Sequence, residues 1–376
     1  MASPSPSKPS LKGRLVALTL GLLFTTIAAE GFLRLTDPTW REYFSGRLMT
    51  IIQVPEYGNV RIGMPGFDGY QAQNNGDFRV HIKVNAIGLR NAEPVSAANG
   101  QVWTMGDSMT FGFGVEHNET YAEQLQEILA QNVYNMAGPG NDVCGYFAMA
   151  KRLPVEIRPK AIVLGLSLEN DVRPYDCSGR IRKETQESAA AKPPSSQLSL
   201  TEVKQFLTEN SALYNFVVVN VKQLDFLNEI LIAGGLMLRE HTEKPHLGAE
   251  KIAEIAALTA LELSRLRKLY PDVPFTVLMI PARLELRDSS GYYKDLRETV
   301  SANIRNVEIS VIDPFRELKK AGFRKVHFLH DGHWTPRGHA IAAKAVSAWM
   351  KDALPVKFDG GFAPLKTVSI PPQLPA

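Results

Sequence analysis

Short apolar runs that alternate with longer stretches of helical spacing are the main pattern along this chain. The runs Val102 to Met105, Ala161 to Leu166 and Phe275 to Ile280 are almost free of polar residues, which is typical of strands covered on both faces. Shorter strands are expected at 133–134 and 307–312, and amphipathic helices near 121–130, 146–153, 252–270 and 336–350. The alternation of strands and helices predicts an α/β fold, a three-layer sandwich with a central parallel sheet.

A second pattern precedes this alternation. Phe78 to Val84 alternates apolar and polar residues without a fault, which predicts a strand with one buried face. We therefore expect residues 40–98 to form a β-containing segment packed on a main domain of residues 99–350. A C-terminal tail, rich in proline, follows at 351–376.

The α/β pattern is interrupted at about 173–250. Residues 178–200 are rich in Ser, Lys, Gln, Ala and Pro, while 200–238 reads as helices with many apolar positions. We interpret this stretch as a helical insertion. Two roles remain open: a lid that shapes the substrate site at the carboxyl edge of the sheet, or a helical extension that completes the core.

The amino end carries a candidate membrane segment. Lys8, Lys12 and Arg14 precede the uncharged run 15–29, which extends to spanning length when flanking charges reach the interface. No clean Ala-x-Ala site ends the run, so an uncleaved anchor at 14–35 is favoured over a signal peptide. With basic residues before the run, residues 1–13 become a cytoplasmic stub. The body of the protein is then placed in the periplasm or outside the cell, held by a single pass through the cytoplasmic membrane.

Composition limits the classes of partner and site. The net charge of +3 over 376 residues, without a basic run interleaved with aromatics, argues against a nucleic-acid partner. Two cysteines exclude a disulfide scaffold and a four-cysteine zinc site, but Cys144 and Cys177 leave one bridge open. His330-x-x-His333 has no second ligand cluster elsewhere, so we predict neither a metal nor another cofactor.

Four polar segments lie just after a predicted strand or just before a helix. Taken singly, each has an ordinary reading as a turn or a helix cap. Because open parallel sheets bind ligands at the carboxyl ends of their strands, we expect the four to meet in one site. They are Gly106-Asp107-Ser108, the stretch 135–140, Asn170-Asp171 and Asp331-Gly332-His333-Trp334.

Ser108 is the candidate nucleophile, at a sharp turn between a buried strand and a helix. A serine hydroxyl needs a base, a group that orients the base, and donors for the developing oxyanion. In Gly-Asp-Ser, Asn-Asp and the late Asp/His pair, residues 78–350 resemble the SGNH (GDSL-like) hydrolase superfamily. The resemblance implies that His333 is the base and Asp331 its orienting acid. It also implies oxyanion donors from the Ser108 N–H, the Gly140 N–H and the Asn170 side chain.

Two positions depart from the family pattern. Leu168 stands where the family usually has glycine, which changes the loop but keeps the Asn170 side chain. The acid and base are separated by one residue, Asp331-x-His333, rather than the usual two. A Ser108–His333 dyad is therefore the alternative to the triad. The shorter spacing resembles a membrane-anchored bacterial branch that is related to polysaccharide O-acetyltransferases.

The resemblance implies a serine esterase that removes O-acyl groups, above all O-acetyl groups, from an envelope or secreted glycan through an acyl-enzyme. Two alternatives remain. The same site is also suited to polysaccharide O-acetyl transfer, and a catalytically silent glycan-binding protein is consistent with the fold. The expected partners are an O-acylated carbohydrate or another ester, the membrane through the N-terminal helix, and proteins of a glycan export or modification system.

Overall fold

The computed structural model describes three long ranges of the chain and four single residues. They are residues 10–177 without 56, 74 and 92, residues 200–222, residues 224, 227, 230 and 233, and residues 247–353. Two compact units emerge. The larger comprises 46–71, 77–192 and 239–376, and the smaller comprises 1–45, 72–76 and 193–238. The predicted C-terminal tail beyond residue 353 and residues 1–9 of the predicted stub lie outside the described residues.

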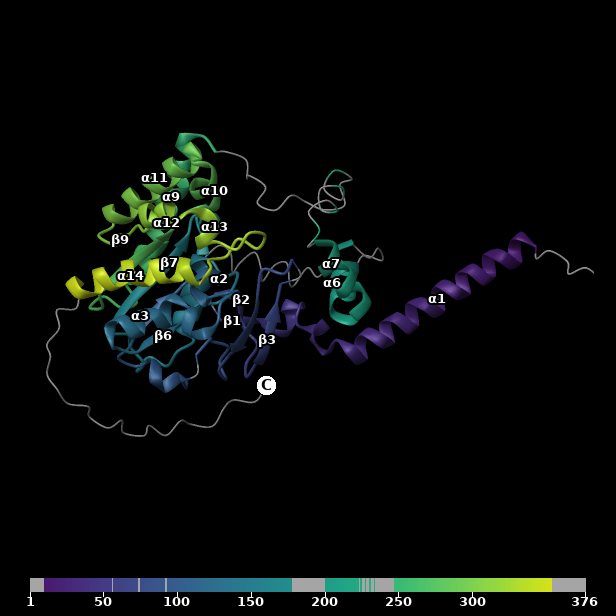
Figure 1. The fold of residues 1–376 in the computed structure, drawn as a ribbon. Coiled ribbons are helices and arrows are strands. Elements are labelled where there is room, and N and C mark those ends of the chain that lie inside the picture. Colours follow the sequence, from purple (N-terminus) through teal and green to yellow (C-terminus); the bar gives the residue numbers. More distant parts are fainter. Residues whose placement is uncertain are drawn as a thin grey trace, which may run out of the picture. The chain divides into compact units, whose positions relative to one another are not determined.

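The larger unit is built on a parallel sheet of five strands in the order β6-β5-β7-β8-β9. Figure 1 shows this unit, with β6, β7 and β9 labelled among its helices. The predicted α/β class and central parallel sheet are confirmed. Each strand is short and ends at the same edge, where the polar segments follow. Their bounds are β5 Val102–Met105, β6 Val133–Asn135, β7 Ala161–Ser167, β8 Phe275–Ile280 and β9 Ser310–Ile312.

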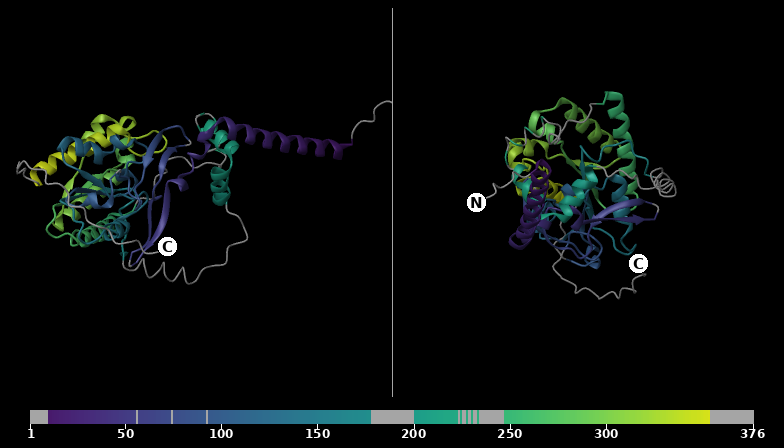
Figure 2. Two further views of the ribbon diagram at one scale, coloured as in Figure 1. Left: turned by 90° about the horizontal axis from the view of Figure 1, so that it is seen from below. Right: turned by 90° about the vertical axis from the view of Figure 1, so that its right-hand side faces the viewer.

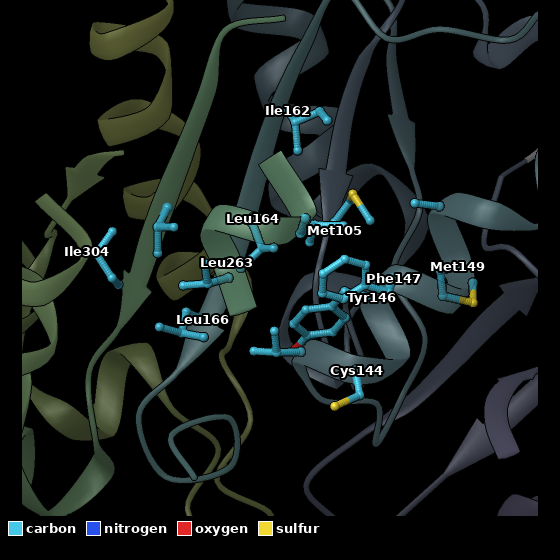
Figure 3. Packing of buried hydrophobic residues seen from close by; sticks show 14 of the residues in the cluster. Met105, Cys144, Tyr146, Phe147, Met149, Ile162, Leu164, Leu166, Leu263 and Ile304 are labelled. Carbon is cyan, nitrogen blue, oxygen red and sulfur yellow. The ribbon is translucent and has the colours of Figure 1, made fainter. Parts of the chain in front are cut away.

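Helices cover both faces of the sheet, which makes the three layers. Side chains alternate along a strand, so Trp103 and Met105 of β5 join one apolar cluster while Val102 joins the other. The first cluster, seen in Figure 3, includes side chains of α4 (Val143–Lys151), α9 (Ala249–Arg267) and α11 (Gly291–Asn306). The second packs against α3 (Tyr121–Leu129) and α14 (Pro336–Ala353). Shorter helices complete this unit: α2 Ser108–Phe111, η3 Val95–Ala98, η4 His117–Glu119, α10 Arg283–Asp288, α12 Phe315–Ala321 and α13 Phe323–Val326.

Two small two-stranded sheets precede the parallel sheet. β1 (Met49–Val54) pairs antiparallel with β2 (Gly58–Gly63) after the short η2 (Ser45–Arg47), and β3 (Asp68–Ala72) pairs with β4 (Arg79–Lys83). The position of β4 matches the strand predicted at 78–84. Val60 and Ile62 of β2 are buried in the first apolar cluster, together with residues of the parallel sheet.

The smaller unit contains the candidate membrane segment. α1 (Leu11–Thr36) is one continuous helix (Figure 2). It is long and apolar enough to cross a membrane, and signal sequences can have the same length and composition. α1 is followed by η1 (Pro38–Arg41) and packs with α7 (Ala212–Lys222), while α6 (Leu200–Asn210) packs with α7 and η1. The carboxylate of Glu30 accepts hydrogen bonds from the N–H groups of Ala212 and Leu213 at the start of α7. The predicted insertion thus contributes two helices to this unit, while its stretch 178–199 lies outside the described residues and its role as a lid stays a prediction.

Candidate active site

Ser108 stands at the turn where β5 ends and α2 begins. Asp107 caps α2, because its carboxylate accepts the backbone N–H of Met109 at 2.9 Å. Gly106 allows the chain to turn this tightly. A Cβ at that position would lie 2.2 Å from Thr110 Oγ1 and 3.0 Å from the carbonyl oxygen of Gly165. The nucleophile candidate is therefore held at the sheet edge by a turn that only glycine fits.

His333 contacts both of its predicted partners. Its Nε2 lies 2.8 Å from Ser108 Oγ, and its Nδ1 is hydrogen-bonded to the Asp331 carboxylate. Gly332 between them has φ +81°, a left-handed conformation that bends the chain back on itself. The same carboxylate also accepts the His333 backbone N–H at 3.3 Å. A separation of one residue is thus sufficient to bring acid and base together.

A hairpin presents this pair. The Phe328 N–H donates to the His333 carbonyl at 2.9 Å, and the Thr335 N–H donates to the Val326 carbonyl at 3.0 Å. Phe113 packs its ring 5.0 Å from the imidazole of His333. At the tip, the Asp77 carboxylate accepts the N–H groups of His330 at 2.9 Å and Asp331 at 2.6 Å. The segment before β4 therefore fixes the loop that carries the acid.

Arg90 holds the loop that follows the nucleophile. Its buried guanidinium donates to the carbonyl oxygens of Gly112 and of Val115, the latter at 2.7 Å. Burial lowers the pKa of Arg90 to about 10, which still leaves the group charged at neutral pH. These bonds satisfy loop carbonyls that would otherwise be buried without donors.

Asn170 lies in the pocket beside Ser108, at the end of β7. Its side-chain amide donates to the second carboxylate oxygen of Asp107 at 3.4 Å. Asp107 is fully buried, and desolvation raises its pKa against the opposing effects of its hydrogen bonds and of His333. Asp107 therefore connects the nucleophile turn with the candidate oxyanion amide.

Asp171, the neighbour of Asn170, has a structural role. Its carboxylate accepts the Tyr146 hydroxyl and the Ser167 N–H, each at 2.8 Å. Its carbonyl accepts the Tyr175 hydroxyl at 2.7 Å. Complete burial raises the pKa of Asp171 well above its usual range. This network anchors the loop that carries Asn170. Leu168, at the start of the same loop, is buried in the first apolar cluster with 2% of its surface exposed.

Of the predicted site residues, Asp331 and Gly140 do not line the pocket; Asp331 contacts it through His333, whereas Gly140 has no such contact with the other four. Gly140 is exposed, with φ +75°, and follows β6. The next residue, Asn141, exchanges two hydrogen bonds with the backbone of Arg61 in β2, at 3.0 and 2.8 Å. The role of Gly140 as an oxyanion donor stays a prediction.

A disulfide joins the two loops beyond these strands. Cys144 of α4 is bonded to Cys177, so the bridge that the sequence left open is formed. Cys144 follows the Gly140 loop and Cys177 follows the Asn170 loop. The bond therefore ties together the segments that carry two of the three predicted oxyanion donors.

The pocket itself is small and polar. Its volume is about 170 Å³, and an ion pair between Glu169 and Arg283, 2.5 Å between Oε2 and Nη2, forms part of its wall. The Arg283 N–H also donates to Glu169 at 2.6 Å. The other lining residues are Ser108, Met109, Ser167, Asn170, Pro281, Gly332 and His333.

Sequence reasoning missed Asp77, Arg90 and the Glu169–Arg283 pair. Asp77 lies in a loop without a motif, and its partners are 253 and 254 residues away. The only available signal for Arg90 was a charged residue at the end of an otherwise apolar turn, Ile87 to Leu89.

No family model and no curated protein matches this sequence. Among solved structures, the chain is similar to a member of the lipolytic protein G-D-S-L family from Veillonella parvula, with 14% identity, a TM-score of 0.35, and coverage of 65% of this chain and 95% of that one. It is similar to the lipase/acylhydrolase from Enterococcus faecalis, with 11% identity, a TM-score of 0.38, and coverage of 67% and 96%. It is also similar to a carbohydrate esterase family 2 enzyme with a carbohydrate-binding domain from Corynascus thermopiles (Myceliophthora fergusii), with 13% identity, a TM-score of 0.37, and coverage of 68% and 67%. These are similarities of fold, and the roles of Ser108, His333 and Asp331 are argued from their own geometry.

Proposed function

We propose that this protein is a serine-dependent ester hydrolase that acts on O-acyl groups through an acyl-enzyme. The observation that carries the proposal is the continuous chain of contacts from Ser108 Oγ to His333 Nε2 and from His333 Nδ1 to Asp331. These are the nucleophile, base and orienting acid that ester cleavage by serine requires.

In the proposed reaction, Ser108 Oγ attacks the acyl carbonyl carbon while His333 Nε2 takes the hydroxyl proton. The tetrahedral intermediate collapses, the ester C–O bond breaks, and His333 returns the proton to the leaving alcohol. Water then attacks the acyl-serine with the same base, which releases the acid and restores Ser108. Asp331 holds Nδ1 protonated and stabilises the imidazolium in both halves.

The negative charge on the carbonyl oxygen requires donors. The Asn170 amide is held beside Ser108 by Asp107, and the Ser108 N–H is at the first position of α2. Gly140 would complete the set on approach of the substrate. Removing one such donor typically costs about 3 kcal/mol of transition-state stabilisation.

The size of the pocket favours a short acyl group. A volume of about 170 Å³ bounded by a partly buried ion pair admits an acetyl group more readily than a fatty acyl chain, which needs a long apolar channel. We propose O-acetyl groups on an envelope or secreted glycan as the substrate. Transfer of the acetyl group to a second glycan uses the same acyl-enzyme and differs only in the acceptor.

The proposed location is the outer face of the cytoplasmic membrane. α1 has the length and apolar character of a span, and the basic residues Lys12 and Arg14 at its amino end support a cytoplasmic orientation of that end. The Cys144–Cys177 bond fits an oxidising compartment for the catalytic unit.

The test uses the full-length protein in detergent with p-nitrophenyl acetate. We expect release of nitrophenolate and, after acid quenching, one acetyl group on Ser108 by peptide mass spectrometry. Ser108→Ala should abolish both, whereas Ser96→Ala, at an exposed position, should retain both. Residual turnover of Ser108→Ala above about one part in a thousand would contradict the covalent mechanism. Acetylation of an added glycan that depends on Ser108 would identify transfer, and absence of turnover and adduct would support the silent glycan-binding alternative.

A further inference from the structure

A second cavity lies at the far end of α10 from the catalytic pocket. We call it the α10 groove. Its volume is about 550 Å³, roughly three times that of the catalytic pocket. It is lined by residues of α10, of the end of α12, of α13 and of the hairpin that carries His333. Among its lining residues are Arg287, Gly322, Phe323, Arg324, Lys325 and Leu329.

The groove and the catalytic pocket share two structural elements. Arg283 lines the pocket and Arg287 lines the groove, and residues four apart lie on one face of a helix. At 1.5 Å per residue they are separated by about 6 Å along the axis of α10. Leu329 of the groove and Gly332 of the pocket belong to the same hairpin. The two cavities therefore share one helix and one hairpin, so the groove adjoins the proposed catalytic pocket.

The groove carries an excess of positive charge. Arg324 and Lys325 are exposed, and within the described residues neither has a carboxylate within ion-pair distance. Arg287 is paired with Asp288 at 2.6 Å, so it contributes a polar donor rather than net charge. Lys320, exposed on the adjoining α12, adds a further cation. Such a surface attracts a negatively charged ligand.

Apolar surface accompanies these cations. Leu329 is 52% exposed, and the ring of Phe323 stacks on His327 at 5.0 Å, which fixes its orientation. Cationic donors beside apolar side chains suit a ligand with alternating anionic groups and C–H faces. A sugar chain with carboxylate substituents has this composition, and arginine binds carboxylates with paired hydrogen bonds.

We propose that the α10 groove binds the glycan portion of the ester substrate and that this glycan is negatively charged. The proposal rests on the proposed function, because the acyl group would occupy the small pocket while the leaving alcohol remains attached to the chain in the groove. The groove then determines which glycan is deacylated. It acts on binding and not on the chemical step.

The test compares three esters on the full-length enzyme in detergent. They are p-nitrophenyl acetate, O-acetylated oligogalacturonate, which is anionic, and O-acetylated xylo-oligosaccharide, which is neutral. Arg324→Gln/Lys325→Gln should raise KM for the anionic oligomer about tenfold, with kcat and both other substrates unchanged, and the effect should shrink at high salt. The matched control is Lys344→Gln/Lys351→Gln, which removes the same charge from exposed positions further along α14. It should leave all three substrates unchanged.

Two results would overturn the proposal: an unchanged KM for the anionic oligomer in the groove variant, or an equal rise for the neutral one. Binding of oligogalacturonate to Ser108→Ala, followed by calorimetry, separates this test from that of the proposed function. If that binding is lost on adding Arg324→Gln/Lys325→Gln, the groove assignment holds even where no ester is hydrolysed. If instead the groove variant loses affinity only for vesicles containing anionic phospholipid, the groove is a membrane contact and the glycan proposal fails.

Discussion

The carboxylate of Asp77 accepts the backbone N–H of Asp331 at 2.6 Å, across 254 residues of sequence. Asp77 lies between β3 and β4 of the N-terminal segment, and Asp331 is the proposed orienting acid. The segment before the sheet is thus part of the support of the active site, because it fixes the backbone from which the acid projects. A backbone N–H to carboxylate bond is among the stronger hydrogen bonds in proteins.

Replacing Asp77 with alanine should lower kcat roughly 10- to 100-fold with little change in KM. The N–H groups of His330 and Asp331 would lose their shared acceptor, so the acid and base would sample unproductive positions, while the pocket that binds the acyl group would be unchanged. Steady-state kinetics with p-nitrophenyl acetate measures this. Asp68→Ala is the control, since Asp68 pairs with His81 and Lys83 at an exposed surface. Equal losses in the two variants would remove Asp77 from the support of the site.

Replacing Asp331 with asparagine should leave the fold intact and reduce kcat up to about 10,000-fold, because the imidazole would be held in the wrong tautomer. A Ser108–His333 dyad would lose far less. His333→Ala should be as damaging as Ser108→Ala, and combining the two changes should add little because they act as one unit. An Asp331→Asn enzyme with more than about a tenth of its activity would contradict the triad.

Asn170→Ala should lower kcat roughly 100- to 1000-fold at nearly constant KM, since the amide acts on charge that develops in the transition state. Asp107→Asn should reduce kcat less, because one oxygen remains to accept from Met109 or from Asn170 but not from both. Circular dichroism of both variants checks the fold. A rise in KM at unchanged kcat would instead place Asn170 in ground-state binding.

Opening the Cys144–Cys177 bridge should lower the free energy of unfolding. The bond closes a loop with a sequence separation of 33, and the chain-entropy model assigns such a loop about 3–4 kcal/mol. Urea unfolding of the full-length protein with and without reductant, and of Cys144→Ser/Cys177→Ser, measures the difference. The double variant should not respond to reductant. Two free thiols in the unfolded, unreduced protein would show that the bond does not form.

His339 should make the protein less stable in acid. It is fully buried, its Nδ1 accepts the Tyr121 N–H at 3.2 Å, and desolvation lowers its pKa from 6.5 to about 3. Between about pH 3 and pH 6.5, His339 therefore binds a proton in the unfolded chain but not in the folded chain. Its contribution to stability is complete above pH 6.5 and is lost as the pH falls towards 3, at up to about 1.4 kcal/mol per pH unit.

The test compares urea unfolding of the wild type and His339→Gln at several pH values. Glutamine keeps an acceptor for the Tyr121 N–H but does not titrate. The stability lost on substitution should therefore shrink by roughly 2 kcal/mol between pH 6.5 and pH 4.5. A cost that is the same at both pH values would show that His339 takes up its proton in the folded protein.

The main strands and the chemical groups of the candidate site could be predicted from the sequence alone. β7 and β8 could be located because strands covered on both faces must be apolar at almost every position, as in Ala161 to Leu166. Ser108, Asn170, Asp331 and His333 could be named because each follows a strand or precedes a helix in a recognisable motif. The same reading brought in Gly140, which the structure leaves outside the pocket.

The strand order and the contacts that position the site residues could be seen only in the tertiary structure. Local propensity does not specify that β5 lies between β6 and β7, because strand order depends on which helices cover which face. The contacts of Asp77 with Asp331 and of Arg90 with the loop after Ser108 join segments that have no shared sequence pattern. From the sequence, the spacing Asp331-x-His333 was compatible with either a triad or a Ser108–His333 dyad. The left-handed turn at Gly332 brings the Asp331 carboxylate into contact with His333 Nδ1. The backbone angle at Gly332, and not the number of residues between the two, sets where the side chains meet.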